Sequence, residues 1–406
     1  MTEAENQNGD QRGGNEDHEK NNKKEEQEGS LFSGPSNGFD ARSQDPRSLF
    51  ALKQWLILQA SLCLSPVHAI ECIEAASGDP GKALRLSRQK ARWSEKELQR
   101  WMNALAQNRI RALPVTSSSY PMSLRVISDP PALLLFRGQL PDWNKPSVAI
   151  VGARAATRYG LTVASQLAED LAKSGITVVS GLARGIDAAA HRGALRFGTT
   201  WAVLGCGPDR IYPGEHKELA NEISRSGTIL SELPLGRPPA APHFPLRNRI
   251  ISGLVKAVVV VEARLRSGSL ITARHALQQG REVMVVPGSI QSPTSDGTNA
   301  LLRDGARPVL DAGDILEFLG ERGLPSVEEP RLTESGDSTY PKETPSRDIL
   351  DTLRRENMDR DSLQRALGLS SRELSLRLVE LEISGWVTTD RDGRLCLTRA
   401  RGLARF

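Results

Sequence analysis

Several features that mark membrane, secreted or metal-binding proteins are scarce in this sequence. Its 406 residues include four cysteines, Cys63, Cys72, Cys206 and Cys396, which lie far apart without a C-x-x-C pair. We therefore expect buried free thiols, and neither a disulfide framework nor a zinc site. No stretch approaches the ~20 apolar residues of a transmembrane helix, and the N-terminus is polar and charged. These absences predict a cytoplasmic protein that has no contact with a membrane.

Signatures of common catalytic machinery are also missing. The sequence has no G-x-x-x-x-G-K-[ST] phosphate loop and no H-E-x-x-H helix, which argues against the usual ATPases and zinc proteases. Asp187 and His191 are four residues apart on one predicted helix, but a third ligand at matching spacing is absent. Because Asp187 lies near the helix start, as a favourable charge or cap, we expect it to make a structural hydrogen bond rather than to act in catalysis. Glu262 could serve as a base, although the arginines after it favour an inert ion pair. We therefore expect binding without catalysis, and neither a cofactor nor a metal.

The sequence is organised around residues 148–160, VAIVGARAATRYG. Four apolar residues run up to Gly152, Arg154 follows shortly after, and a helical pattern begins at Leu161. A strand, a tight turn and a helix start in this order form the place where open α/β sheets bind phosphate. Gly152 lets the backbone approach an anion, and the guanidinium of Arg154 suits phosphate oxygens. The turn departs from G-x-G-x-x-G, so a nicotinamide or flavin cofactor is not expected.

Strand and helix patterns alternate through the rest of the central region. Continuous apolar runs suit strands that are buried on both faces of a sheet. The alternation predicts an α/β fold with an extended Rossmann-like, doubly wound parallel sheet, whose site lies at the carboxyl ends of its strands. The predicted strands lie near Leu133, Val148, Ile176, Thr200, Thr228, Ala257, Val283 and Arg307.

Composition and periodicity divide the chain into five regions. The first is poor in large apolar residues and predicts disorder, whereas the last combines three amphipathic helices with a hairpin. The third of these helices mixes glutamates with arginines, so both DNA and protein remain open as its partner. The regions are a disordered tail (1–47), a small helical, SAM-like domain (48–112), a Rossmann-like domain (113–320), a polar linker (321–345) and a winged helix (346–406).

Arginines follow the predicted strands with a regularity that a set of solvated surface residues would not show. Because the strand ends share one edge of a parallel sheet, these side chains predict a common phosphate-binding rim. Helix starts at Gly185, 267–272 and 297–299 would add backbone N–H groups. The arginines at successive strand ends are Arg154, Arg184, Arg210, Arg247 with Arg249, and Arg264 with Arg266.

The predicted ligand of this rim is a single-stranded nucleic acid. A repeating phosphate backbone explains many arginines along one edge better than a single nucleotide does. Tyr159, Tyr212 and Phe244 are close to the rim in the sequence and could stack on unpaired bases. A duplex groove is read by a projecting helix, whereas a rim of loops suits a flexible strand.

Eight segments follow one another through the central region. They are, in order, VAIVGARAATRYG, SGLARGIDAAAHRGAL, AVLGCGPDRIYPGEHKEL, ILSELPLG, FPLRNRIISGL, VVVVEARLRSGSLITARHAL, GREVMVVPGSI and GTNALLRDGA. In this order they resemble the DprA/Smf family of DNA-processing proteins. The likeness covers the whole predicted sheet domain, and the flanking helical module and winged helix also resemble members of this family.

This resemblance implies a cytoplasmic bacterial protein that binds and protects single-stranded DNA. It further implies that the protein promotes loading of a RecA-type recombinase during natural transformation, acts as a homodimer, and has single-strand-binding protein as a further partner. The phosphate-binding arginine of the family maps onto Arg154, its R-N-R segment onto residues 247–249, and its S-G-S-L-I-T-A helix start onto residues 267–273. The expected DNA-binding residues are Gly152, Arg154, Arg158, Gly185, Arg247, Asn248, Arg249, Ser267, Gly268, Ser269 and Thr272.

Two alternatives come from other functional classes. One is a nucleotide-handling enzyme of the phosphoribohydrolase type, whose comparable loop resembles P-G-G-x-G-T-x-x-E. Here that loop reads SGSLITA after Arg266, without the second pair of glycines and without the glutamate. The other is a regulator that binds double-stranded DNA through the winged helix alone.

Overall fold

The protein is described by a computed structural model covering residues 38–88, 94–320, 344–383, 386–389 and 394–397. The chain divides into two compact units at Leu324, and each unit is described by itself. Within these ranges, no helix combines the length and the hydropathy that crossing a lipid bilayer requires.

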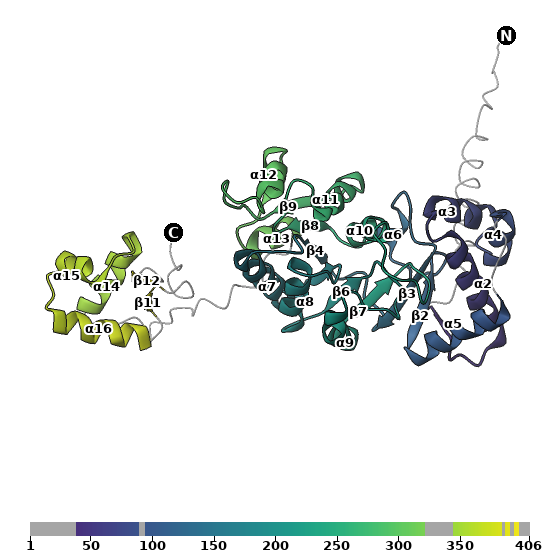
Figure 1. The fold of residues 1–406 in the computed structure, drawn as a ribbon, viewed down its shortest axis with the longest axis horizontal. Helices are drawn as coiled ribbons and strands as arrows, with labels where there is room; N and C mark the ends of the chain where they lie inside the picture. Colours follow the sequence, from purple (N-terminus) through teal and green to yellow (C-terminus); the bar gives the residue numbers. More distant parts are fainter. Residues whose placement is uncertain (1–37, 89–93, 321–343, 384–385, 390–393, 398–406) are drawn as a thin grey trace, which may run out of the picture. The chain divides into compact units, whose positions relative to one another are not determined.

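A ten-stranded sheet runs through the first unit (Figure 1), in the order β1-β2-β3-β7-β6-β5-β4-β8-β9-β10. The seven strands from β7 to β10 are parallel, whereas β1, β2 and β3 continue the sheet in antiparallel pairs. The chain fills the sheet from β4 to β7 and then crosses to β8 on the other side of β4, which is the predicted doubly wound order. The strands are β1 (Phe39–Asp40), β2 (Ile110–Pro114), β3 (Leu133–Gly138), β4 (Ser147–Val151), β5 (Thr177–Ser180), β6 (Thr200–Val203), β7 (Thr228–Ser231), β8 (Ala257–Val260), β9 (Glu282–Val285) and β10 (Arg307–Pro308).

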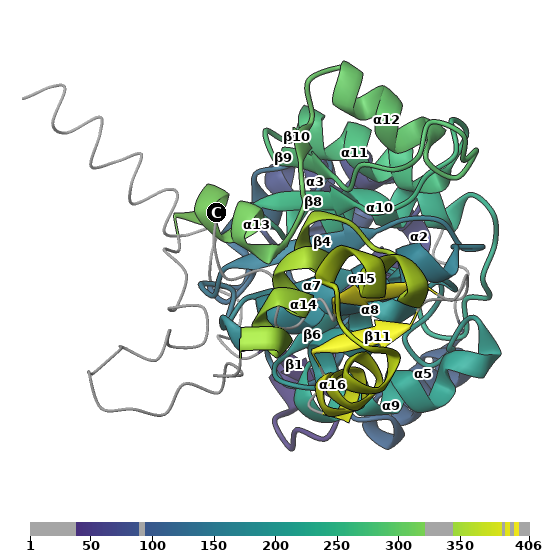
Figure 2. The ribbon, with the colours of Figure 1, turned by 90° about the vertical axis from the view of Figure 1, so that its left-hand side faces the viewer.

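Helices cover both faces of the parallel sheet (Figures 1 and 2). Val148 and Ile150 of β4 pack in a core with residues of α7 and α8, whereas Ala149 and Val151 belong to a second core that includes α10 and α11. This alternation follows from the two-residue period of a strand and explains why the strand sequences are continuously apolar. The helices are α7 (Arg158–Lys173), α8 (Ile186–Leu195), η1 (Gly214–His216), α9 (Lys217–Ser226), α10 (His243–Gly253), α11 (Gly268–Gln278), α12 (Asp296–Arg303) and α13 (Ala312–Leu319).

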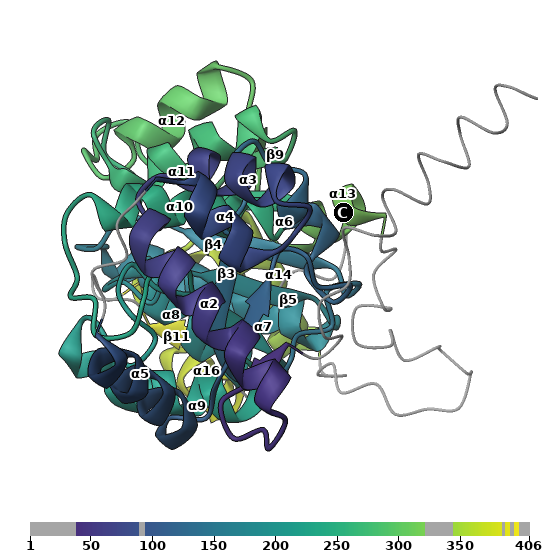
Figure 3. The same cartoon turned by 90° about the vertical axis from the view of Figure 1, so that its right-hand side faces the viewer.

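The N-terminal helices form a module that packs against β2 and β3 (Figure 3). A capping box starts α5, where Ser94 and Glu97 exchange hydrogen bonds. Leu52 of α2 and Leu105 of α5 belong to the same core cluster as Leu134 of β3, so the module shares the core of the sheet. Its helices are α2 (Pro46–Leu62), α3 (Pro66–Ala75), α4 (Pro80–Leu86) and α5 (Glu95–Gln107), and the short α6 (Met122–Arg125) follows β2.

The structure corrects both ends of this module. Residues 38–47 were expected to belong to a disordered tail, but Phe39 is buried, with 6% of its surface exposed, and β1 pairs with β2. β2 also begins at Ile110, inside the predicted helical domain. One phenylalanine creates no periodic pattern, and strand pairing across 70 residues leaves no local signal. The prediction for residues 1–37 lies outside the described residues.

The second unit is a small winged helix with its own core (Figure 2). Leu353, Leu363 and Leu378, one from each helix, pack with Leu395 of the hairpin. This confirms the three helices and two strands expected from the sequence. Of the predicted linker (321–345), residues 321–343 lie outside the described residues, as does the turn at 390–393, whereas residues 344–345 already belong to α14. The elements are α14 (Thr344–Arg355), α15 (Arg360–Leu367), α16 (Ser371–Ile383), β11 (Val387–Thr389) and β12 (Leu395–Leu397).

Candidate nucleic-acid interface

A pocket of about 910 Å³ opens at the carboxyl ends of β4 and β8, where the strand order reverses. Open α/β sheets bind ligands at this switch point because the loops on its two sides diverge. The pocket brings together eight of the eleven predicted residues. They are Gly152, Arg154, Arg247, Asn248, Ser267, Gly268, Ser269 and Thr272.

Positive charge and aromatic surface lie side by side on one wall of the pocket. The guanidinium of Arg154 lies 4.9 Å from the centroid of the Phe244 ring, and the ring of Tyr212 lies 5.7 Å from the same ring. Arg264 and Arg266, from the loop after β8, are exposed and also line the pocket. A cation over a ring face and a neighbouring exposed ring together suit a phosphate that carries a base. Tyr159 lies elsewhere and donates a hydrogen bond to the carbonyl oxygen of Pro287.

Hydrogen bonds to Glu262 fix the loop that carries Arg154. This buried carboxylate accepts hydrogen bonds from the backbone N–H of Thr157 (2.9 Å) and from its hydroxyl (2.5 Å). A side chain at Gly160 would place its Cβ 2.4 Å from the Glu262 carboxyl carbon, so glycine is required there. The expected ion pair between Glu262 and the following arginines is wrong: the carboxylate positions the loop after β4.

The start of α11 forms part of the pocket lining, through Ser267, Gly268, Ser269 and Thr272. Ser267 caps the helix by accepting from the Ser269 amide, and Gly268 is exposed with open space around its Cα. Asn248 of α10 donates to the Gly268 carbonyl oxygen (3.2 Å), which ties this helix end to α10. The partial positive charge of a helix N-terminus favours an anion at this position.

The other two predicted helix starts are engaged by the protein itself. The amide of Ile186, at the start of α8, donates to the carbonyl oxygen of Ala153 (3.2 Å), and a Cβ at Gly185 would lie 2.2 Å from that same oxygen. At the start of α12, the amide of Gly297 donates to the carbonyl oxygen of Ala263 (2.7 Å). Gly185 and residues 297–299 lie outside the pocket lining, although Asp187, in the first turn of α8, belongs to it. Contact between Gly185 and the ligand therefore stays a prediction, and close backbone packing requires this glycine.

Arg247 lies in the floor of the pocket and bridges two strand ends. With 5% of its surface exposed, it donates to the carbonyl oxygens of Gly181 (2.8 Å) and Val203. Asp187 accepts from the amides of Gly181 (3.1 Å) and Ala183 (3.3 Å), as expected for a structural hydrogen bond. Burial lowers the pKa of Arg247 to about 10 and raises the pKa of Asp187, and each charge opposes the shift of the other. Arg247 therefore remains a cation at neutral pH.

His191 does not form a catalytic pair with Asp187. Its Nδ1 lies 2.7 Å from the Thr200 hydroxyl, and complete burial lowers the pKa of the imidazole to about 3. Within the described residues, no group of three or more His, Cys, Asp or Glu side chains could hold a metal ion. All four cysteines are free, with Cys72 and Cys206 buried.

Arg249 and Arg158 are not part of the pocket. Arg249 has 1% of its surface exposed and pairs with Asp129 and Glu232, so the expectation that it contacts the ligand is wrong. Its neighbour Arg247 faces the pocket because successive helix residues are rotated by about 100°. Arg158 is exposed at the start of α7, outside the pocket lining.

Two further arginines of the predicted rim also lie outside the pocket lining. Arg184 forms an ion pair with Glu215, at 2.8 Å between Nε and Oε1, whereas Arg210 is exposed. The rim is therefore shorter than the sequence suggested.

One wall of the pocket was missed by sequence reasoning. Pro239, Ala240 and Ala241, from the segment between β7 and α10, line it together with Phe244 and Pro245 in the first turn of α10. The signal was available, because a proline-rich segment between a strand and a helix is a rigid loop at a strand end.

Comparison with known proteins assigns the chain to a family. A family model described as DNA recombination-mediator protein A matches residues 111–320, and one described as the DprA winged helix domain matches residues 333–393. This chain belongs to the DprA/Smf family. Protein Smf of Escherichia coli K12 is 39% identical over 324 residues, which cover 79% of this chain and 86% of that protein. DNA processing protein DprA of Bacillus subtilis 168 is 38% identical over 279 residues, covering 68% of this chain and 92% of that protein.

A solved structure agrees with this assignment. The X-ray structure of DprA from Streptococcus pneumoniae is 33% identical and superimposes with a TM-score of 0.56, covering 66% of this chain and 96% of that one. Membership of the DprA/Smf family gives the chain a role in DNA processing, and the family match from 111 to 320 includes the whole pocket.

Proposed function

We propose that the pocket between β4 and β8 binds single-stranded DNA. The observation that carries this proposal is the convergence of Arg154, Arg264, Arg266 and the start of α11 on one pocket whose wall contains Phe244 and Tyr212. Cations and helix amides suit successive phosphates, and the rings suit unpaired bases. Bases of a duplex stay stacked inside the helix and would not reach the rings.

The same geometry argues against the nucleotide-handling enzyme. Both acids near the pocket are committed to protein groups: Asp187 to the amides of Gly181 and Ala183, and Glu262 to Thr157. Neither is placed to transfer a proton to a substrate, so we propose a binding protein. As its biological role, we propose protection of DNA strands and loading of a RecA-type recombinase by a homodimer during natural transformation.

A competition experiment tests the ligand class. A fluorescent oligo-dT is bound to the full-length protein, followed by anisotropy, and challenged with unlabelled oligo-dT, a duplex of the same length, or thymidine monophosphate. We expect only the single strand to compete at comparable concentrations, and the logarithm of the binding constant to fall linearly with the logarithm of salt concentration. Equal competition by the monophosphate would favour the enzyme, and preference for the duplex would favour the winged-helix regulator. A strand-exchange assay with the cognate recombinase then tests loading.

A further inference from the structure

Three consecutive residues of α10 reach three different parts of the fold. Arg247 donates to the carbonyl oxygens at the ends of β5 and β6, and Asn248 donates to the carbonyl oxygen of Gly268 at the start of α11. Arg249 points the other way, towards the end of β7 and the connector before β3. The position of α10 therefore determines where Asn248 holds the helix end that faces the ligand.

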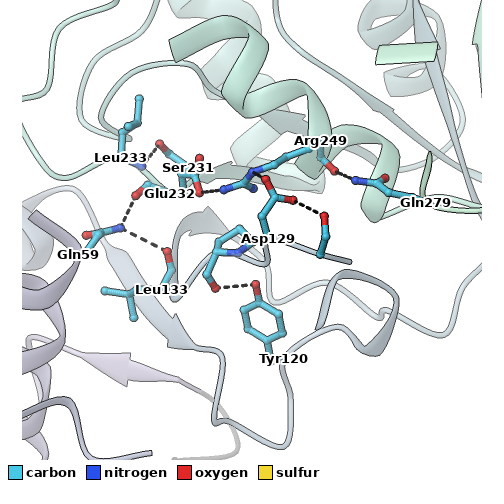
Figure 4. A network of polar contacts seen from close by, with 11 residues as sticks. Gln59, Tyr120, Asp129, Leu133, Ser231, Glu232, Leu233, Arg249 and Gln279 are labelled. Carbon is cyan, nitrogen blue, oxygen red and sulfur yellow. Dashed lines mark hydrogen bonds and ion pairs between the residues drawn. The ribbon is translucent and has the colours of Figure 1, made fainter. Parts of the chain in front are cut away.

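Arg249 lies at the centre of a buried polar network (Figure 4). Its Nη2 donates to Oε2 of Glu232 (2.5 Å), and its Nε lies 2.9 Å from Oδ2 of Asp129. Glu232 directly follows β7, and burial raises the pKa of its carboxyl, an effect that the charge of Arg249 opposes. The backbone carbonyl oxygen of Arg249 also accepts a hydrogen bond from Gln279 (3.0 Å), just beyond the end of α11.

The network extends into the N-terminal helical module. Gln59 of α2 is buried and donates to the carbonyl oxygens of Glu232 (2.7 Å) and Leu133 (3.3 Å), and Figure 4 shows it on the far side of Glu232 from Arg249. One arginine thus connects α10, the end of β7 and the connector before β3, while Gln59 attaches the helical module to the same strand end.

This arrangement constrains α10 more tightly than apolar packing would. The guanidinium of Arg249 donates a hydrogen bond to Glu232 and forms an ion pair with Asp129, and a buried charge without its partners is strongly disfavoured. The helix therefore cannot shift or rotate without breaking a buried ion pair. Lysine at this position would keep the charge but could not hold both carboxylates in the same geometry.

We propose that Arg249 is a positioning residue for the nucleic-acid pocket, which it shapes through α10 and Asn248 without touching the ligand. This inference rests on the proposed binding of single-stranded DNA. Under this inference, the buried ion cluster of Arg249, Asp129 and Glu232 contributes to binding affinity as well as to stability.

The test compares Arg249→Lys with the parent in full-length protein. Affinity for fluorescent oligo-dT is measured at a temperature where circular dichroism shows both proteins to be folded. We expect Arg249→Lys to bind about tenfold more weakly, because a shift of α10 would cost the pocket about as much as one charged hydrogen bond to the ligand. Arg111→Lys is the matched control: Arg111 lies over the Phe136 ring and donates to the carbonyl oxygen of Gly138, outside the pocket lining, so its affinity should stay within twofold of the parent.

A double-mutant cycle separates positioning from a purely structural role. If Arg249 acts through Asn248, the double variant with Arg249→Lys and Asn248→Ala should lose much less affinity than the product of the two single-variant losses. Full additivity, or an affinity of Arg249→Lys within twofold of the parent while Arg154→Glu loses binding, would overturn the inference. Normal binding by Arg154→Glu would instead refute the proposed pocket.

A second variant covers the case in which Arg249→Lys does not fold. Asp129→Ala removes one of the two carboxylates that Arg249 bridges, at a position with a quarter of its side chain exposed, and leaves the pair with Glu232 in place. We expect several-fold weaker binding from this folded variant. Affinity equal to that of the parent would count against the inference in the same way.

Discussion

At the scale of single residues, the direction in which a side chain points decides whether it lines the pocket. Arg247 and Arg249 are two positions apart and both buried, yet the first lies in the floor of the pocket and the second belongs to an ion cluster behind it. Arg154 is exposed on a loop that Glu262 holds in place. An arginine count along the sequence therefore overstates the number of arginines that line the pocket.

Reversal of charge at Arg154 should abolish most binding. Arg154→Glu places a carboxylate where a phosphate is expected, so we expect single-strand affinity to fall at least 100-fold, on the order of 3 kcal/mol, with the melting temperature unchanged. Arg225→Glu is the matched control, because Arg225 is exposed in the last turn of α9, which precedes β7 and lies outside the pocket lining. Anisotropy with oligo-dT measures both. Unchanged affinity of a folded Arg154→Glu protein would contradict the assignment.

A methyl group at Gly181 should disturb the floor of the pocket. Its Cβ would lie 2.3 Å from Nη1 of Arg247, which has no room to move away because it also donates to the carbonyl oxygen of Val203. We expect Gly181→Ala to lower the free energy of unfolding by about 1–3 kcal/mol, as for overpacking of a core. Gly214→Ala is the control: open space surrounds Gly214, so the free energy of unfolding should hardly change. Gly175→Ser would not serve, because the φ of +78° at Gly175 strains any side chain. Urea titration followed by circular dichroism distinguishes them.

The buried His191 should make stability depend on pH. Because burial lowers its pKa from 6.5 to about 3, the unfolded chain takes up a proton below pH 6.5 that the folded protein refuses until about pH 3. Stability is therefore lost as the pH falls through this window. Between pH 7 and 4.5, the free energy of unfolding should fall by roughly 2 to 3 kcal/mol more in the parent than in His191→Gln. Urea unfolding at several pH values measures this. If the free energy of unfolding depended on pH equally in both proteins, His191 would not be the source of the acid sensitivity.

At the scale of elements, the pocket is built from strand ends, one helix N-terminus and one loop wall. The loops after β4 and β8 diverge because the strand order reverses there: from β4 the sheet is filled towards β7 on one side and towards β10 on the other. Helix α11 starts directly after the second loop. The sheet continues beyond β7 through three antiparallel strands that join it to the helical module. The site and the module are thereby parts of one packed unit.

The first strand should contribute to stability although it is two residues long. Phe39 of β1 is buried in the core that α2 and α5 share with the sheet. We expect Phe39→Ala to lower the free energy of unfolding by about 3–5 kcal/mol, as for other large-to-small changes in cores. Phe50→Ala provides the control, since Phe50 is 63% exposed and its removal should change stability little. A Phe39→Ala protein as stable as the parent in guanidinium titration would remove β1 from the core.

At the scale of the whole molecule, the pocket and the winged helix belong to different units. The pocket lies entirely within the first unit, and the winged helix from α14 to β12 has a core of its own. Its third helix bears Glu373 and Glu380 beside Arg377, and Arg377 forms an ion pair with Glu380 (3.0 Å). These charges leave little net attraction for DNA phosphates.

Truncation after Leu324 should therefore preserve single-strand binding. The shortened protein keeps the sheet, the helical module and every residue of the pocket, so we expect its affinity for oligo-dT to stay within a few-fold of that of the full chain. Anisotropy titrations of both proteins at one salt concentration provide the comparison, with melting curves as the control for folding. Complete loss of binding would transfer the site to the winged helix.

The sequence by itself determined what depends on neighbouring residues. Alternating periods gave the parallel strands and their helices, the small-residue turn after β4 placed Arg154, and the ordered motifs indicated the DprA/Smf family. These features are local, so hydrophobic spacing and turn chemistry encode them directly.

Tertiary structure alone decided which of these residues meet. Helix rotation and packing turned Arg249 away from the pocket, engaged the starts of α8 and α12 with carbonyl oxygens, and brought Phe39 into a core some 70 residues distant along the chain. Such outcomes depend on long-range pairing and on the burial of charge with its partner. Neither leaves a pattern in the order of residues.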